Sequence, residues 1–228
     1  MNLVPFILAI APVVAIVWYI YHKDRYEHEP LRYLILSFVL GLICASIVPF
    51  MNDRLSPLFS FTQGTAWELL ITAFFLIAFL EELIKFICLR FFMYYRRVFN
   101  EPMDGIVYGV MIGMGFATLE NLYFVIEGGW QVAIVRMFTA VPAHAVFGVV
   151  MGYYVGKAKY NKEASFSYSL KAFFVPVFLH GLYNYLLLQD KLPGLGLAAI
   201  LGLIVAIRYS RKLIKEQQDA SPFKSDQS

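Results

Sequence analysis

Five acidic or imidazole side chains of this sequence fall inside hydrophobic stretches, where ionisable groups are rare. They are Glu81, Glu82, Glu120, His144 and His180, and they belong to four different stretches. A carboxylate or imidazole in a bilayer interior is costly unless it faces water or a polar partner, so by default it marks a functional site. These groups transfer protons, activate water and bind divalent metals. The sequence therefore predicts one polar centre shared by four segments.

Two hydrolytic chemistries fit these residue types. In the first, a carboxylate acts as general base on a water that attacks a peptide carbonyl, while His180 and Asn184, one turn apart, stabilise the oxyanion. In the second, one divalent metal ion such as zinc activates the water. Its candidate ligands are Glu81, Glu120, His144 and His180. The spacing leaves both chemistries open.

Other protease motifs are missing from the sequence. It contains no His-Glu-x-x-His, no Gly-x-Ser-x-Gly and no pair of aspartyl-protease motifs. Zincin, serine and aspartyl mechanisms are therefore disfavoured.

Composition indicates that the polar centre lies in a membrane protein. Hydrophobic residues make up 60% and charged residues 15% of the 228 residues, and the mean hydropathy is +0.64. A membrane-spanning helix needs roughly 20 apolar residues. Seven apolar runs approach this length, at about 3–21, 32–51, 66–93, 105–126, 131–155, 170–188 and 194–209. We expect an all-α, polytopic transmembrane bundle of about seven helices, with a membrane-embedded domain at 1–209 and a basic tail at 210–228.

Basic residues indicate the orientation of this bundle. Fifteen of the 19 Lys and Arg residues fall in alternate loops and in the tail, whereas the opposite loops hold only Arg54 and Lys191. The positive-inside rule then places the N-terminus outside and the C-terminus in the cytoplasm. The tail is interpreted as a topology anchor, so no nucleic-acid partner is expected. The loop from His22 to Glu29 is interpreted as a solvated segment of mixed charge without chemistry.

Small residues recur at every fourth position on two of the predicted helices. They are Gly105, Gly109, Gly113 and Ala117 on one helix, and Ala140, Gly148, Gly152 and Gly156 on the other. This spacing lets helix backbones approach closely in lipid, which would bring Glu120 within reach of His144. At 1.5 Å per residue, the candidate side chains all lie about 16–23 Å from the cytoplasmic helix ends, so they share one layer.

Two basic residues inside the helices bear on how the carboxylates are used. Lys85 lies one turn from both Glu81 and Glu82, so the three could form a purely structural ion cluster. Because adjacent helical residues point about 100° apart, we expect one glutamate to serve the reaction and the other to pair with Lys85. Arg136 is expected to be a carboxylate partner or an interfacial anchor.

Several motifs follow one another along the chain in a fixed order. They are Glu81-Glu82-x-x-Lys85, Asp104-Gly105-Ile106-Val107-Tyr108-Gly109, Gly115-Phe116-Ala117-Thr118-Leu119-Glu120-Asn121, Pro142-x-His144 and His180-Gly181-x-x-Asn184. Together they resemble the PrsW family of bacterial intramembrane proteases, a distant relative of the CAAX prenyl endopeptidases. The segment from Lys23-Asp24 to Glu29-Pro30 is similar too, so the resemblance covers nearly the whole chain.

The resemblance implies both an active site and a substrate. Glu120 closes the family's Phe-x-x-x-Glu motif at a position where the CAAX enzymes have His, and His144 is expected to supply the imidazole. The catalytic residues expected are Glu81, Glu82, Glu120, His144, His180 and Asn184. The implied function is site-1 cleavage of a single-span membrane anti-sigma factor, which activates an extracytoplasmic-function sigma factor under envelope stress. The implied location is the lipid bilayer of a bacterial cell membrane.

Two functions of other classes also fit a buried polar layer. An ion-coupled or proton-coupled transporter uses such groups, but it predicts repeat symmetry and a water-filled route through both faces, and no internal repeat stands out in the sequence. A non-catalytic membrane binding or immunity protein would use the layer for structure alone. In that case Glu81→Gln and His180→Ala would lower stability without removing a reaction.

Overall fold

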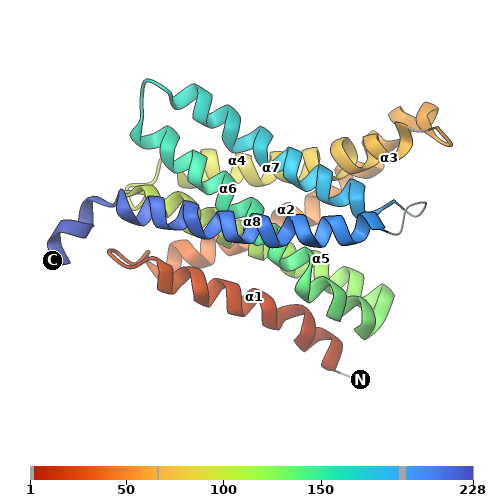
Figure 1. The fold of residues 1–228 in the computed structure, drawn as a ribbon, viewed down its shortest axis with the longest axis horizontal. Coiled ribbons are helices and arrows are strands. Elements are labelled where there is room, and N and C mark those ends of the chain that lie inside the picture. Colours follow the sequence, from red (N-terminus) through yellow and green to blue (C-terminus); the bar gives the residue numbers. More distant parts are fainter. Residues whose placement is uncertain (1–2, 66, 190–193, 228) are drawn as a thin grey trace.

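The protein is a bundle of helices in a computed structural model that describes residues 3–65, 67–189 and 194–227 (Figure 1). Seven long helical runs make up the described chain, and no strand occurs in it. The runs are α1 (Val4–Lys23); α2 (Leu31–Leu55) with η1 (Ser56–Thr62); α3 (Trp67–Ile71), η2 (Thr72–Phe79), α4 (Leu80–Ile87) and η3 (Cys88–Met93); α5 (Pro102–Phe138); α6 (Ala140–Tyr160); α7 (Ser165–Leu187); and α8 (Gly194–Asp219), followed by η4 (Pro222–Gln227). The predicted all-α bundle is confirmed.

The helices lie side by side along the long axis of the molecule and alternate in direction. The α1–α2 loop, the α6–α7 loop and the C-terminus gather at the left end of Figure 1, and the N-terminus lies at the other end. The basic loops predicted to share one side of the membrane therefore do share one end of the bundle, which we call the basic end. Lys191, assigned to the opposite end, lies outside the described residues.

Length and apolar composition qualify four helical stretches as membrane spans. They are Val4–Lys23, Leu31–Thr62, Pro102–Tyr160 and Ser165–Leu187. The third stretch holds two antiparallel helices, because the chain reverses at Gly129, whose φ of 70° suits a residue without a side chain. Large apolar side chains such as Trp18 and Phe178 are exposed on the outer helices. Such an apolar outer surface is suited to contact with lipid.

The helix α5 is the core of the bundle, and small residues hold it against its neighbours. Every residue from Pro102 to Ala117 is buried. A Cβ at Gly105 would lie 2.3 Å from the carbonyl oxygen of Gly152, and one at Gly109 would lie 2.5 Å from that of Gly148. The predicted close approach of these two helices is therefore confirmed.

The structure adds a second close approach that the sequence analysis did not predict. On the α2 side, a Cβ at Gly115 would lie 2.0 Å from the carbonyl oxygen of Phe38, and one at Gly41 would lie 2.1 Å from that of Ile112. The core helix is thus in backbone contact with neighbours on two sides.

The last helix is longer than expected. The sequence analysis predicted its end at residue 209, but α8 continues to Asp219. Leu213, Ile214 and Gln217 are buried on one face of this extension, while Arg211 and Lys212 on the other face are exposed. An amphipathic helix of this kind can pack on a protein although its net composition is polar. The search for apolar runs therefore missed this part of the helix.

The packing of α5 on α6 generates a stability prediction. In Gly152→Ala the new Cβ would lie 2.1 Å from the carbonyl oxygen of Gly105, so the helices must separate. We expect the free energy of unfolding to fall by about 1–3 kcal/mol, the usual cost of overpacking a core. The measurement is the unfolding midpoint of the purified protein in detergent.

The matched control for this measurement is Gly202→Ala on α8, where a Cβ meets nothing within 4 Å. This variant should unfold at the wild-type midpoint or slightly above it, since Ala favours helix over Gly. Equal shifts in both variants would show that close α5–α6 packing does not stabilise the fold.

Candidate active site

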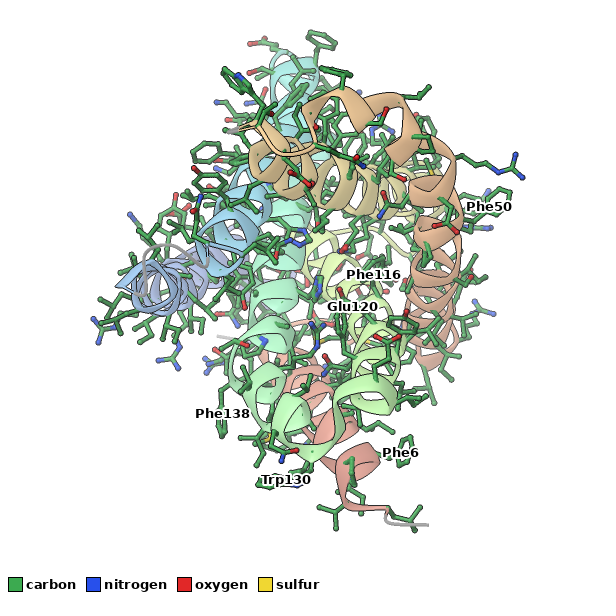
Figure 2. The ribbon with its side chains drawn as sticks, turned by 90° about the vertical axis from the view of Figure 1, so that its right-hand side faces the viewer. Phe6, Phe50, Phe116, Glu120, Trp130 and Phe138 are labelled. Carbon is green, nitrogen blue, oxygen red and sulfur yellow. The ribbon has the colours of Figure 1, made fainter. Side chains whose placement is uncertain are left out.

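The predicted site residues come together at the junction of four helices. Glu81 and Glu82 lie on α4, Glu120 on α5, His144 on α6, and His180 with Asn184 on α7. Both Glu81 and Glu82 are buried, as are the two imidazoles, whereas Glu120 is half-buried. Figure 2 shows Phe116 and Glu120 pointing into the bundle, while Phe6, Phe50, Trp130 and Phe138 lie at its periphery. The expected shared layer is present.

The ammonium of Lys85 lies at the centre of this layer. Its Nζ donates to Glu81 Oε2 at 3.2 Å and to Glu82 Oε1 at 2.9 Å. The same atom lies 3.3 Å from Nδ1 of His144 and 3.8 Å from the ring centre of Phe116. The expectation that only one glutamate pairs with Lys85 is wrong, because the long lysine side chain, one turn further along α4, reaches both carboxylates.

The imidazole of His144 links this centre to a second ion pair. Its Nε2 lies 2.9 Å from Glu120 Oε2, and an Arg136 guanidinium nitrogen lies 2.6 Å from the same oxygen. A neutral imidazole that donates from Nε2 to Glu120 leaves Nδ1 as an acceptor for Lys85, so both hydrogen bonds are satisfied by one tautomer. Arg136 also donates to Asn121. Its predicted role as a carboxylate partner is confirmed.

The imidazole of His180 is held on the other side of the glutamate pair. Its Nδ1 lies 2.9 Å from Glu82 Oε1. The ring stacks on Phe147 at a centroid distance of 4.7 Å and meets the His144 ring edge to face at 5.4 Å. When Nδ1–H of the neutral imidazole donates a hydrogen bond to this carboxylate, Nε2 carries the lone pair. In the part of the chain that the structure describes, no hydrogen bond is formed by Nε2.

A cavity of about 230 Å³ adjoins the network between α5, α6 and α7. Its wall includes Glu120, Arg136, His144, His180 and Asn184. Neither Glu81 nor Glu82 lines it. The two imidazoles therefore separate the glutamate pair from the space that a substrate can enter.

The cavity wall also contains a residue that the sequence analysis missed. The hydroxyl of Tyr183 is buried, lines the cavity and has no hydrogen-bond partner among the described residues. Its position inside the His180 to Asn184 turn was the only available signal, because an aromatic residue in an apolar helix otherwise indicates packing.

The side chains that lie close enough together to bind one metal ion differ from the four predicted ligands, because Glu82 takes the place of Glu120 and His180. Ligand atoms of Glu81, Glu82 and His144 lie within 4.8 Å of one another. Glu82 Oε2 is buried and has no hydrogen-bond partner among the described residues. The Nε2–H group of His144 donates a hydrogen bond to Glu120, and metal-binding histidines usually form such a bond with the ring nitrogen that does not bind the metal. These residues fit a divalent metal in kind and in closeness, although the Lys85 ammonium is the cation they contact here.

Comparisons with known proteins found a matching family and several curated relatives. Residues 29–209 match the model of a family described as PrsW family intramembrane metalloprotease. The curated Protease PrsW of Geobacillus kaustophilus is 39% identical over 81% of this chain and 80% of its own length. The Protease PrsW of Bacillus subtilis is 36% identical over 78% of this chain and 80% of its own length. No solved structure matches the chain.

The ion pair beside the cavity generates a test by double substitution. The side chains of Glu120 and Arg136 are 22% and 15% exposed, so their charges are only partly solvated. Arg136→Gln leaves a carboxylate without its cation, and we expect a loss of about 1–3 kcal/mol of unfolding free energy. Glu120→Gln/Arg136→Gln should recover part of this loss, because no unpaired charge remains.

The measurement is the unfolding midpoint of Arg136→Gln, Glu120→Gln and the double variant in detergent. Arg208→Gln, at an exposed position on α8 without an ion pair among the described residues, is the control and should leave the midpoint unchanged. A double variant whose loss is the sum of the single losses would contradict the pairing.

Proposed function

The chain belongs to the PrsW family of bacterial intramembrane proteases, and we propose that the residues from α4 to α7 described above form its active site. Its catalytic and positioning residues are Glu81, Glu82, Glu120, His144, His180 and Asn184. We propose further that the substrate is a single-span membrane anti-sigma factor. Site-1 cleavage of this substrate would lead to activation of an extracytoplasmic-function sigma factor during envelope stress.

The observation that carries this proposal is a polar cavity next to a buried network of carboxylates and imidazoles. Leu187 in the cavity wall is the last residue of α7, at the end of that helix far from the basic end, and Thr139 lies ten residues beyond the turn at Gly129. With the predicted orientation, the cavity lies in the outer half of the membrane. A first cut on the outer side of a membrane-anchored substrate requires this placement.

The geometry supports a division of labour among the site residues. Glu82 orients His180 through Nδ1, so that Nε2 can take a proton from a water in the cavity as the water attacks the peptide carbonyl carbon. The amide of Asn184 and the hydroxyl of Tyr183 would donate to the oxyanion. Protonated His180 would then deliver its proton to the amide nitrogen as the C–N bond breaks.

We infer that zinc is the metal that the family's description implies, held by Glu81, Glu82 and His144. Carboxylate and imidazole ligands suit zinc. When bound, it would make a bound water more acidic. Glu120 and Arg136 would keep the His144 ring oriented from behind. The ion would replace the Lys85 ammonium as the cation that these three side chains contact.

Cleavage of a co-expressed single-span anti-sigma factor tests the proposed activity. Glu82→Gln and His180→Ala should each reduce the shortened fragment by about 100-fold or more, the usual contribution of proton transfer. Cleavage is measured by immunoblotting the substrate fragments in membranes that contain equal amounts of each variant.

Glu127→Gln is the matched control for Glu120→Gln, because Glu127 lies on α5 two turns further on and is exposed. It should cleave at the wild-type rate, whereas Glu120→Gln should be impaired. Continued cleavage by Glu82→Gln and His180→Ala would overturn the site assignment, and their absence from the membrane would favour a structural role for the layer.

Metal content and cleavage by purified protein test the zinc proposal. We expect about one zinc per chain in wild type and in Glu127→Gln, and loss of this zinc in His144→Ala. Removal of the metal by a chelator should abolish cleavage, and zinc should restore it. Full cleavage by metal-free protein would show that the glutamate and histidine residues act on water alone.

A further inference from the structure

Five acidic side chains gather at the basic end of the bundle, far from the active site. Asp24, Glu27 and Glu29 belong to the α1–α2 loop, and Glu101 and Asp104 to the start of α5. At 1.5 Å per residue, Asp104 lies about 24 Å along α5 from Glu120. The sequence analysis assigned this loop to solvent, but the structure buries Asp24 and Glu29 and leaves Glu27 half-buried.

The five carboxylates form two overlapping groups. Oxygens of Asp24, Glu101 and Asp104 lie within 4.8 Å of one another, and so do oxygens of Glu27, Glu29 and Asp104. Asp104 belongs to both groups. The exposed fractions are 0% for Asp24 and Asp104, 1% for Glu101 and 3% for Glu29, so water does not screen these groups.

One oxygen of each of the four most buried carboxylates is held by a hydrogen-bond donor. Asp104 Oδ2 accepts the backbone N–H groups of Asn100 at 2.6 Å and Glu101 at 2.8 Å. Asp24 Oδ2 accepts the N–H of Glu29, and Glu29 Oε2 accepts the hydroxyl of Tyr108. The Glu101 side chain accepts the N–H of Asp104. These donors orient the carboxylates and favour their charged forms.

The second oxygen of each carboxylate is buried without a hydrogen-bond partner among the described residues. These atoms are Asp24 Oδ1, Glu27 Oε2, Glu29 Oε1, Glu101 Oε2 and Asp104 Oδ1. Buried polar atoms are almost always paired, so a group of five calls for a ligand. A bound cation would satisfy these oxygens and neutralise the charge of their carboxylates.

No cation of the described chain forms an ion pair with these carboxylates. Lys159, whose charge interacts with that of Asp104, donates its hydrogen bond to the carbonyl oxygen of Tyr94. Without a counter-charge, carboxylates this close together repel one another, and their burial disfavours the charged forms. The charged forms that these hydrogen-bond donors favour are therefore unstable unless a cation binds from solution.

We propose that these carboxylates bind a hard divalent cation, Mg²⁺ or Ca²⁺, at the basic end of the bundle. Such ions are bound by oxygen ligands, and the carboxylates of Asp and Glu are prominent among them. Asp104, which belongs to both groups, is the central ligand. This site contains no nitrogen or sulfur donor, in contrast to the active site, and it does not depend on the proposed proteolytic function.

The cation would hold the α1–α2 loop against the start of α5. The α1–α2 loop supplies three ligands, and the first turn of α5 supplies two. Gln218 of α8 donates to the carbonyl oxygen of Lys23, directly before Asp24, so the end of α8 rests on the same loop. Binding would therefore stabilise the basic end of α5, the helix that carries Glu120.

Thermal unfolding of the chelator-treated, purified full chain in detergent tests the site. Mg²⁺ and Ca²⁺ are added in separate titrations, and at least one should raise the melting temperature of wild type by about 5 °C at saturation. Asp104→Asn and, as a second variant, Asp24→Asn should lose this rise. Asparagine keeps the shape and one acceptor oxygen, so both variants should still fold.

Two controls separate this site from others. Glu163→Gln alters an exposed carboxylate at the same end and should keep the full response. Glu82→Gln should keep it as well, which distinguishes the site from a catalytic metal. The proposal is overturned by a wild type that responds to neither ion, as expected if protons alone neutralise the carboxylates. It is equally overturned by the same rise in Asp24→Asn and Asp104→Asn as in wild type.

Discussion

The burial of one ammonium between two carboxylates is the constraint on which the site depends. Lys85 with Glu81 and Glu82 would be very costly in an apolar interior if any of the three lost its partners. Lys85 therefore contacts both carboxylates, the His144 ring and the face of Phe116. Each contact comes from a different direction, so α4, α5 and α6 can satisfy the lysine only if they meet at one depth.

Close helix packing makes that meeting possible. The stripes of small residues let α5 and α6 approach until a Cβ at Gly113 would lie 2.9 Å from the carbonyl oxygen of His144. The imidazole is then near enough to α5 to bond Glu120 and near enough to α4 to contact Lys85. The small residues of α5 and α6 thus determine how the ionisable side chains of the site lie relative to one another.

The sequence predicted which residues meet at the candidate site better than it predicted the hydrogen bonds and ion pairs between them. Buried Glu and His in apolar stretches, the glycine spacing and the turn at Gly129 are local signals, and the structure confirms that the residues converge. The fold-back of Arg136 onto Glu120 and Asn121 could not be read from spacing, because it depends on the angle at which the chain leaves Gly129. The burial of Asp24 and Glu29 could not be predicted for a similar reason, since it depends on contacts with the first turn of α5 and the end of α8.

The two ends of α5 show how one rule on buried charge leads to different outcomes. At the active site, Lys85 and Arg136 stand against Glu81, Glu82 and Glu120, so with neutral imidazoles the layer keeps a single net negative charge. At the basic end, five carboxylates have no ion-pair partner within the described chain. The first layer is balanced mainly by the protein itself, whereas the second requires protons or a cation from its surroundings. Because α5 carries residues of both, the stability of the helix that presents Glu120 is expected to depend on what fills the other end.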